Sequence, residues 1–346
     1  MNRALRTPLV AVVATVTVVT AALSTSACGS SSTDAGGSSG APASVSLKIG
    51  QTGWAASQAA LQVAGLDNTP YRIEWPVFSG GDQQLQALQS KALDVAQSSE
   101  TPPIFVAAGG TVNFTQVAVQ TASTLLQEVV VGKDSSITSI KDLKGKKVGY
   151  VKNTTAAYFL NELLKQNGLS WTDIESRPVS PNDGLAALQG GSIDAFASYG
   201  NTIIQAHAGG AKTIGSGENI LSGNFPWSTT KALLGDAAKK AALADLLARL
   251  DRAYAYIRDG HLADYAKRFA AATKQPEASA VQQITQQEAQ RPTHLGVVTP
   301  AAEQSQQRVA DSFVDIKAIP AAVKVSDLWS TDLNSALQSA LEKGGK

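Results

Sequence analysis

The sequence contains a single cysteine, Cys28, and only three histidines among its 346 residues. One thiol can form no intramolecular disulfide framework and no zinc site built from several cysteines. The histidines, His207, His261 and His294, lie far apart in the sequence. We expect them to be surface or capping residues and predict neither a metal site nor a cofactor.

An excess of charge of one sign is also absent, because 29 basic residues stand against 28 acidic ones. No basic stripe indicates a nucleic-acid partner, and no acidic tail indicates a basic one. After residue 23 the sequence has no second apolar run long enough to cross a membrane. We therefore expect a soluble body that carries no membrane-spanning helix.

The N-terminus combines a short positive region with an apolar run. Arg3 and Arg6 precede the run Leu9–Leu23, which is followed by Ser-Thr-Ser-Ala-Cys28. This pattern is similar to a lipoprotein signal, and it predicts that residues 1–27 are removed and that Cys28 carries the lipid. The alternative is an ordinary secretory signal in which Cys28 is incidental. Residues 28–44, rich in Gly, Ser, Ala and Pro, indicate a flexible tether to a body outside the cytoplasm.

From residue 45 onward, strand-like and helix-like segments alternate, which is typical of an α/β fold. The segment Leu85-x-x-Leu-Gln-x-x-x-Leu-Asp94 recurs as Leu185-x-x-Leu-Gln-x-x-x-Ile-Asp194, and a serine follows four residues after each Asp. This repeat predicts two lobes on one plan, each a mostly parallel sheet flanked by helices, with a ligand cleft between them. We expect residues 45–132 in the first lobe, residues 133–225 in the second, and residues 226–346 back in the first. The last part is predicted to contain long Ala-rich helices at 236–257, 261–273 and 277–290, and a last helix at about 301–313.

Four predicted strand-to-helix turns are rich in small polar residues. In open α/β sheets the ligand crevice lies at such turns, and a helix start presents free N–H groups that suit an anion. The alternative is that they are ordinary helix caps. The Gly80-Gly81 pair has the wrong spacing for a dinucleotide fingerprint, so we reject a nucleotide enzyme. The turns are Ser79–Asp82, Ser98–Pro103, Asn153–Tyr158 and Ser198–Thr202.

Aromatic residues near these turns could wall an organic ligand, although each could equally belong to the core: Trp54, Tyr158, Tyr199, Phe225 and Trp227. Glu100 is unusual there. Its carboxylate would repel an anion unless it points away or accepts capping bonds, and it would suit a ligand with a donor group.

Several motifs resemble the aliphatic-sulfonate, taurine and nitrate branch of ABC-transporter substrate-binding proteins. They are Asp134-Ser-Ser-Ile-Thr-Ser-Ile-Lys-Asp-Leu-Lys-Gly-Lys-Lys-Val, Phe78-Ser-Gly-Gly, Thr101-Pro-Pro-Ile-Phe-Val-Ala-Ala-Gly-Gly, Gly191-Ser-Ile-Asp-Ala-Phe and Ile316-Lys-Ala-Ile-Pro. The resemblance implies a type II periplasmic-binding-protein fold and a monomer. It also implies a lipid-anchored receptor whose lobes close on a solute, for delivery to a permease driven by a cytoplasmic ATPase. The ligand-binding residues that we expect are Trp54, Ser79, Gly80, Ser99, Glu100, Thr101, Thr154, Thr155, Tyr158, Tyr199 and Asn201.

Two departures from the family pattern bear on the solute. Sulfonate binders usually have Gly-Asp before the Pro-Pro pair, where this chain has Ser99-Glu100-Thr101, and Trp-Asp-Pro-Tyr where it has Ser198-Tyr-Gly-Asn201. We expect a small organosulfonate, with a thiamine-type pyrimidine as the alternative that would use Glu100 as acceptor. A desulfinase-like enzyme of the same fold would need a Cys or His at the turns, which have neither. A sensor subunit would have the same sequence features.

Overall fold

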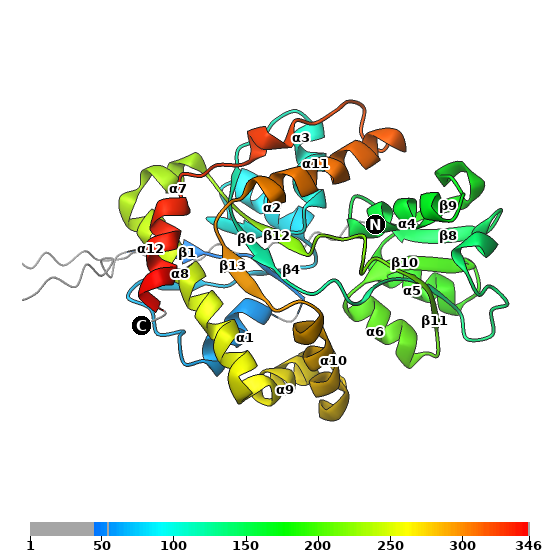
Figure 1. The fold of residues 1–346 in the computed structure, drawn as a ribbon, viewed down its shortest axis with the longest axis horizontal. Coiled ribbons are helices and arrows are strands. Elements are labelled where there is room, and N and C mark those ends of the chain that lie inside the picture. Colours follow the sequence, from blue (N-terminus) through cyan, green and yellow to red (C-terminus); the bar gives the residue numbers. More distant parts are fainter. Residues whose placement is uncertain (1–44, 54, 345–346) are drawn as a thin grey trace, which may run out of the picture. The chain divides into compact units, whose positions relative to one another are not determined.

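The computed structural model describes residues 45–53 and 55–344, which belong to one compact unit within residues 40–346. The predicted signal, the predicted lipidation site Cys28, the predicted tether and Trp54 lie outside the described residues. Figure 1 shows two lobes in this unit, each with its own sheet and helices.

The first lobe contains a four-stranded sheet in the order β13-β6-β12-β5, and the strand pairs β1–β3 and β2–β4 lie beside it. A parallel bridge between Ile49 and Val95 joins the first strands to β5. The strands are β1 (Ser46–Lys48), β2 (Gln51–Thr52), β3 (Arg72–Glu74), β4 (Val77–Phe78), β5 (Val95–Gln97), β6 (Thr115–Thr121), β12 (Asn224–Thr229) and β13 (His294–Gly296).

Helices from both ends of the chain cover the first-lobe sheet. The long helix α8 buries a leucine-rich face against the sheet together with Leu47, Ile49 and Trp227. The predicted Ala-rich helices are confirmed to within two residues at each end. The helices are α1 (Ala56–Val63), α2 (Gly81–Gln89), α3 (Thr101–Ala108), α7 (Lys231–Gly235), α8 (Ala237–Tyr256), α9 (Leu262–Thr273), α10 (Glu277–Gln290), α11 (Pro300–Asp315) and α12 (Asn334–Gly344).

The second lobe contains a five-stranded sheet in the order β11-β7-β10-β8-β9. Its core is built around Phe159 and Phe196, which are fully buried. The strands are β7 (Gln127–Val131), β8 (Lys147–Val151), β9 (Glu175–Val179), β10 (Ala195–Tyr199) and β11 (Lys212–Ser216), and the helices are α4 (Thr155–Gln166), α5 (Pro181–Gln189) and α6 (Asn201–Ala208).

The strand directions correct one expectation. β8, β9 and β10 are parallel as predicted, but β7 is antiparallel to both β10 and β11. In the first lobe β12 is antiparallel to both β5 and β6. The reason is that β6 and β7 carry the chain out of one lobe into the other, and the returning chain runs in the opposite direction. Our placement of residues 127–131 in the first lobe was therefore wrong.

The internal repeat is confirmed in its hydrogen bonding. The carboxylate of Asp94, just before β5, accepts the backbone N–H of Lys48 at 2.9 Å. Asp194, just before β10, accepts the backbone N–H of Lys147 at 2.8 Å. Each aspartate thus ties the start of its strand to the neighbouring part of its sheet, which explains why the two sequence segments match.

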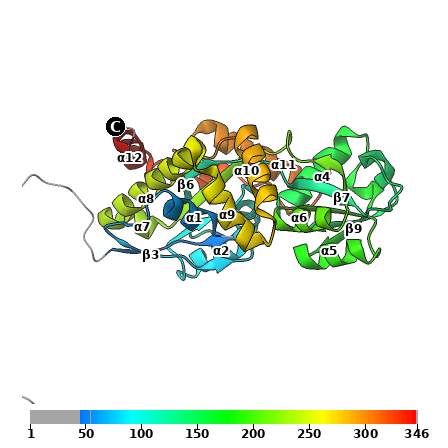
Figure 2. The same ribbon diagram turned by 90° about the horizontal axis from the view of Figure 1, so that it is seen from below.

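The two lobes are joined by two crossing segments and by a helix contact. The backbone N–H of Ala122 on the outgoing segment donates to the carbonyl of Gly223 on the returning one at 2.9 Å. Helix α4 of the second lobe packs against α11 of the first, where Asn161 donates to the Ser312 hydroxyl at 3.0 Å. Figures 1 and 2 both show α4 beside the end of α11. These contacts hold one side of the lobe pair together.

Candidate functional site

A cavity of about 1050 Å³ lies between the two lobes. Much of its wall consists of the carboxyl ends of strands and the helix starts that follow them, as expected for open α/β sheets. The lining residues include Ser79, Gly80, Asp82, Lys152, Thr154, Tyr199, Asn201, Tyr254, Tyr265, Phe269 and Glu288. A cavity of this volume can enclose an organic molecule, because typical ligand pockets measure about 300–1000 Å³.

Helix starts from both lobes open into this cavity. The Thr154 hydroxyl, at the N-cap of α4, accepts the N–H of Ala156 at 3.2 Å and donates to the Val151 carbonyl at 2.7 Å. Helices α2 and α6 begin after Gly80 and Gly200, and neither has a side-chain cap. Their first N–H groups therefore remain for a ligand, and they lie at the positive ends of the helix dipoles.

Gly200 has a backbone conformation that favours glycine, with φ of 55° and ψ of −133°. An L-residue with a side chain rarely adopts this conformation. The turn between β10 and α6 thus needs glycine at this position, and it directs the start of α6 toward the cavity. The sequence analysis named the turn but not the reason for this glycine.

Tyr199, at the end of β10, and Asp82 of the first lobe both line the large cavity. Burial raises the pKa of the Tyr199 hydroxyl to about 12; the Asp82 carboxylate adds to this, and a hydrogen bond with Thr154 opposes it. Asp82 belongs to the first turn of α2, and its carboxylate lies over Gly80, where a Cβ would stand 2.5 Å from its oxygen. Residues of both lobes thus face each other across this cavity.

The other five described candidates surround a second, much smaller cavity of about 20 Å³. This volume has room for about one water molecule. The Thr155 hydroxyl donates to the side chain of Gln127 at 2.8 Å, while the Thr101 hydroxyl is buried without a hydrogen-bond partner. The candidates here are Ser99, Glu100, Thr101, Thr155 and Tyr158.

Glu100 is buried and has three side-chain donors. Its carboxylate accepts hydrogen bonds from Ser222 at 2.7 Å, Asn224 at 3.1 Å and Ser305 at 3.2 Å. Burial raises the pKa of the Glu100 carboxyl, and these hydrogen bonds oppose the shift. Glu100 thus joins the start of α3 to the returning segment and to α11, and it lines the small cavity instead of the large one.

The structure therefore divides the sequence candidates into two groups. Ser79, Gly80, Thr154, Tyr199 and Asn201 line the large cavity. Of the aromatic residues considered as walls, Phe225 lines the small cavity, and Trp227 is fully buried in the first-lobe core. Trp227 is thus not a wall of the large cavity, because β12 directs it into the core.

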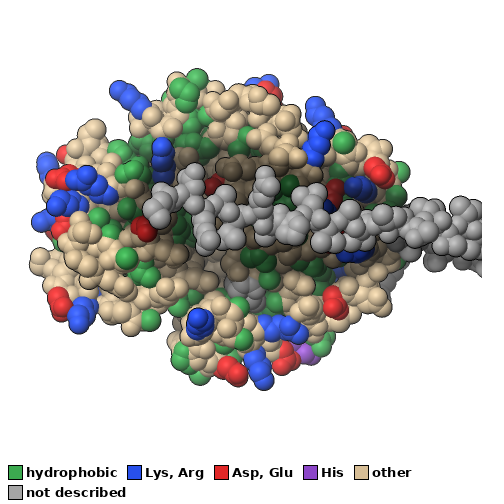
Figure 3. Space-filling model, turned by 180° about the vertical axis from the view of Figure 1, so that it is seen from behind, with side chains coloured by type: hydrophobic (Ala, Val, Ile, Leu, Met, Phe, Trp, Pro, Cys, Tyr) green, Lys and Arg blue, Asp and Glu red, His purple; other side chains and the backbone are tan. Residues whose placement is uncertain are grey.

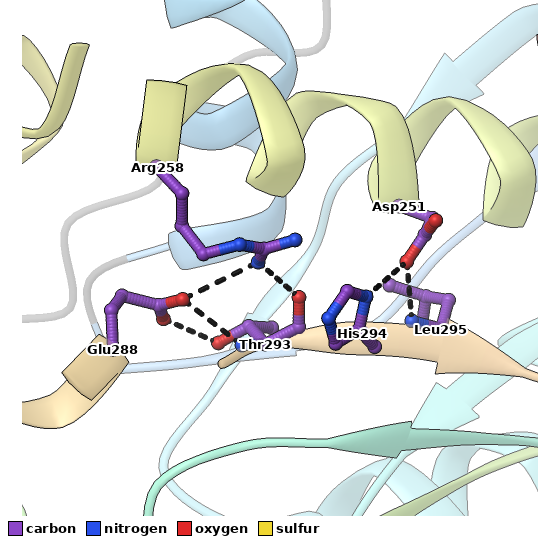
Figure 4. Close-up of polar contacts among 6 residues, drawn as sticks. All are labelled: Asp251, Arg258, Glu288, Thr293, His294 and Leu295. Carbon is purple, nitrogen blue, oxygen red and sulfur yellow. Dashed lines mark hydrogen bonds and ion pairs between the residues drawn. The ribbon is translucent and has the colours of Figure 1, made fainter. Parts of the chain in front are cut away.

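Sequence reasoning missed one wall of the large cavity, which comes from α8, α9, α10 and the segment before β13. Figure 4 shows part of it: the Glu288 carboxylate accepts the Thr293 hydroxyl at 2.6 Å and the Thr293 N–H at 3.0 Å. Arg258 lies 3.4 Å from the same carboxylate and donates to the Thr293 carbonyl at 2.5 Å. No turn motif marks these residues in the sequence. Only the return of the chain to the first lobe brings them to the site.

Two further features of the described residues concern metals and membranes. In the described part of the chain, no three His, Asp or Glu side chains gather as potential metal ligands. None of the helices within residues 55–344 combines the length and the hydropathy that a bilayer crossing needs. On the face shown in Figure 3, basic and acidic side chains are interspersed.

Comparison with known proteins identifies relatives in sequence. Residues 78–222 match the family described as NMT1/THI5 like. A protein of Escherichia coli (strain K12) named as an aliphatic sulfonates-binding protein is 32% identical over 159 residues, which are 44% of this chain and 49% of that protein. The chain thus spans about half the length of the curated relatives that it matches.

Solved structures share the fold. The periplasmic aliphatic sulphonate-binding protein SsuA of Escherichia coli has a TM-score of 0.73 and 24% identity over 82% of this chain and 92% of its own. The alkanesulfonate-binding protein SsuA of Xanthomonas axonopodis pv. citri, solved bound to MOPS, has the same TM-score and identity over 84% of this chain and 98% of its own.

An enzyme also shares the fold. The desulfurization enzyme DSZB has a TM-score of 0.59 and 17% identity over 87% of this chain and 99% of its own. The fold by itself is therefore used by both binding proteins and an enzyme. The α/β two-lobe architecture of the type II periplasmic-binding-protein class is confirmed. Residues 78–222 thus match the NMT1/THI5-like family, 159 residues of the chain are similar to an aliphatic sulfonates-binding protein, and the chain has the fold of the solved sulfonate-binding structures.

Proposed function

We propose that this protein is the extracytoplasmic solute-binding component of an ABC importer, and that it captures a small organic anion of the aliphatic sulfonate type. The observation that carries the proposal is the cavity of about 1050 Å³, which helix starts of both lobes line. The matched sulfonate-binding relatives support the same class of solute. The protein delivers the solute to a membrane permease with a cytoplasmic ATPase.

The anionic group of the solute lies against the starts of α4 and α6. Thr154 and Asn201 stand at these starts, and Tyr199 precedes the second one. Backbone N–H groups at a helix start bind an anion without an arginine, because the helix dipole adds to their hydrogen bonds. Ser79 and Gly80 contribute from the first lobe. Ser99, Glu100, Thr101, Thr155 and Tyr158 act on the lobe junction at the small cavity.

Lobe closure gives the binding its mechanism. A solute that contacts both lobes binds the closed form better than the open form, and it therefore shifts the population toward closure. The two crossing segments, 122–126 and 217–223, act as the hinge, and Thr124 on the first donates to the Glu218 carbonyl on the second at 3.0 Å. Removal of residues 1–27 makes Cys28 the N-terminus, and the lipid on Cys28 anchors the protein to the membrane. The protein works as a monomer.

A second candidate solute is a heteroaromatic molecule such as a thiamine-type pyrimidine. The first-lobe wall favours it, because the largely buried aromatic side chains of Tyr254, Tyr265 and Phe269 give this side of the cavity an apolar lining. An enzymatic function is the weaker alternative. The described residues that line the large cavity include no cysteine and no histidine, the nucleophile and base that a desulfinase-like reaction would use.

A thermal-shift panel on the full chain tests the proposal. The panel holds alkanesulfonates, taurine, aryl sulfonates, nitrate, thiamine pyrimidines and flavins. A ligand that binds only the folded state raises the melting temperature by mass action. We expect a saturable rise with at least one organosulfonate. A rise with heteroaromatic compounds alone would mean that the solute is heteroaromatic and not a sulfonate. Turnover of a sulfinate by the protein would mean that it is an enzyme and not a solute-binding protein.

A further inference from the structure

Helix α10 connects the wall of the large cavity to the two segments that cross between the lobes. Its residues Gln283, Gln287 and Glu288 line the cavity. Gln290 is the last residue of the helix and comes three residues after Gln287, so the two side chains lie on the same face, one turn apart. This face of α10 therefore forms part of the cavity wall and then reaches the crossing segments.

The side-chain amide of Gln290 holds the outgoing segment through Thr124. The amide oxygen accepts the backbone N–H of Thr124 at 3.2 Å, and the amide nitrogen donates to the Thr124 hydroxyl at 3.0 Å. Thr124 is buried, and its hydroxyl donates in turn to the Glu218 carbonyl of the returning segment at 3.0 Å. Gln290 thus begins a chain of hydrogen bonds that links the first lobe to both crossing segments.

The next residue, Arg291, binds the returning segment directly. Its guanidinium donates to the Ser222 carbonyl, and the neighbouring Gly223 has a φ of 75°, a conformation that favours glycine. A Cβ on Gly223 would collide with the same guanidinium. Thr124 lies between β6 and β7, and Ser222 lies between β11 and β12. The end of α10 therefore contacts both segments where the chain passes from one lobe to the other.

We propose that Gln290 is a positioning residue that sets the equilibrium between the open and closed lobes without contacting the solute. This inference rests on the proposed function. The lining of the large cavity includes Gln287 but not Gln290. With its amide in place, the crossing segments are held at fixed points on the first lobe, and the unliganded chain has a narrow range of lobe angles. Without the amide that range widens, so binding of a solute has to order the lobes at a larger entropic cost.

An effect on lobe closure differs measurably from an effect on a solute contact. A change in the closure equilibrium alters the apparent affinity for every solute by the same factor, because one competent fraction scales each intrinsic affinity. The loss of a contact alters the affinity by a factor that depends on the solute. Two sulfonates with different ends, 2-aminoethanesulfonate and 1-hexanesulfonate, distinguish the two cases.

Calorimetric titration of the full chain with both probes tests the proposal. We expect Gln290→Ala to bind each probe more weakly than the wild type by one common factor of about three to ten. Thr124→Val, which removes the hydroxyl at the other end of the hydrogen bond, should also weaken both probes by one factor. The loss in the double variant should be smaller than the product of the two single losses, because the two changes share a bond. The matched control is Gln286→Ala, an exposed glutamine of the same helix outside the cavity lining, which should keep the wild-type affinities.

Small-angle X-ray scattering of the same chains tests the inference without a solute. The unliganded Gln290→Ala chain should have a larger radius of gyration than the unliganded wild type, and the two values should agree when a probe saturates both chains. Different loss factors for the two probes, wild-type affinities in Gln290→Ala, or equal scattering of the two unliganded chains would overturn the inference and leave the proposed function standing. If neither probe binds the wild type, the sulfonate proposal is wrong, and the scattering of the unliganded chains still tests the role of Gln290.

Discussion

The carboxylate of Glu100 accepts a 2.7 Å hydrogen bond from the hydroxyl of Ser222, although 122 residues separate the two in the sequence. Ser222 lies on the segment that returns from the second lobe, and Glu100 lies at the start of α3 in the first. The same carboxylate binds Asn224 and Ser305. This contact fixes the returning segment to the first lobe at the point where the two lobes join.

Replacing Glu100 by alanine is expected to destabilise the protein. The change leaves the donors of Ser222, Asn224 and Ser305 without their acceptor in a buried place, and such losses cost about 2–3 kcal/mol. Urea unfolding of the full chain measures the effect. Glu277→Ala, an exposed carboxylate in the first turn of α10, serves as the control. Equal stability of the two variants would show that the Glu100 contacts contribute nothing.

The stability of the protein should depend on pH through Glu100. Burial raises the pKa of this carboxyl above its ordinary value of 4.5. At pH values between 4.5 and the folded pKa, the folded state therefore holds a proton that the unfolded state has lost. The contribution of Glu100 to the free energy of unfolding is therefore complete below pH 4.5, and it declines as the pH rises through the folded pKa. Unfolding experiments at several pH values compare the wild type with Glu100→Gln. The wild type should gain stability relative to the variant as the pH falls through this window, and a constant difference would contradict the assignment.

The two neighbouring threonines at the start of α4 should have different effects on binding. Thr154 lines the large cavity and caps the helix, whereas Thr155 donates to Gln127 beside the small cavity. Thr154→Ala is expected to weaken binding of 2-aminoethanesulfonate by about 1 kcal/mol or more. Thr155→Val should leave the affinity near the wild-type value. Calorimetric titration of both variants measures the two affinities. A loss of affinity in Thr155→Val but not in Thr154→Ala would contradict the account, because it would place the solute at the small cavity.

Gly184 in α5 is expected to tolerate no side chain. A Cβ at this position would lie 2.3 Å from ring atoms of Phe196 and 2.9 Å from Val179, so the second-lobe core would have to shift. Alanine normally favours a helix over glycine, but overpacking costs about 1–3 kcal/mol and should dominate here. The control is Gly235→Ala at the end of α7, where a Cβ meets nothing within 4 Å. Thermal unfolding should show a lower melting temperature for the first variant alone.

Local sequence patterns predicted much of the fold. The repeat around Asp94 and Asp194 marks the same hydrogen bond in both lobes. The small polar turns at Ser79, Thr154 and Tyr199 open into one cavity, because ligand crevices lie at the carboxyl ends of strands and these ends of the two lobes face the same space. These features depend on residues close together in the sequence, and periodicity and capping rules describe them well.

Other features depend on contacts between distant segments, which no local pattern contains. The partners of Glu100 come from the returning segment and from α11, so the sequence could indicate that its carboxylate was unusual but not what it binds. The wall that includes Tyr254 and Glu288 belongs to helices whose sequence predicts only an amphipathic surface. The antiparallel direction of β7 was not predicted either, because the sequence does not mark where the chain changes lobes.

Calorimetric titration of the full chain and of Asn201→Trp with 2-aminoethanesulfonate tests the central claim most directly. Asn201 lies at the start of α6 and lines the large cavity, so an indole at this position would fill the proposed anion site. We predict one binding site per chain in the wild type and no detectable binding in Asn201→Trp, with cooperative thermal unfolding of both. Wild-type affinity in the folded variant would contradict the account, because it would place the solute outside the cavity between the lobes.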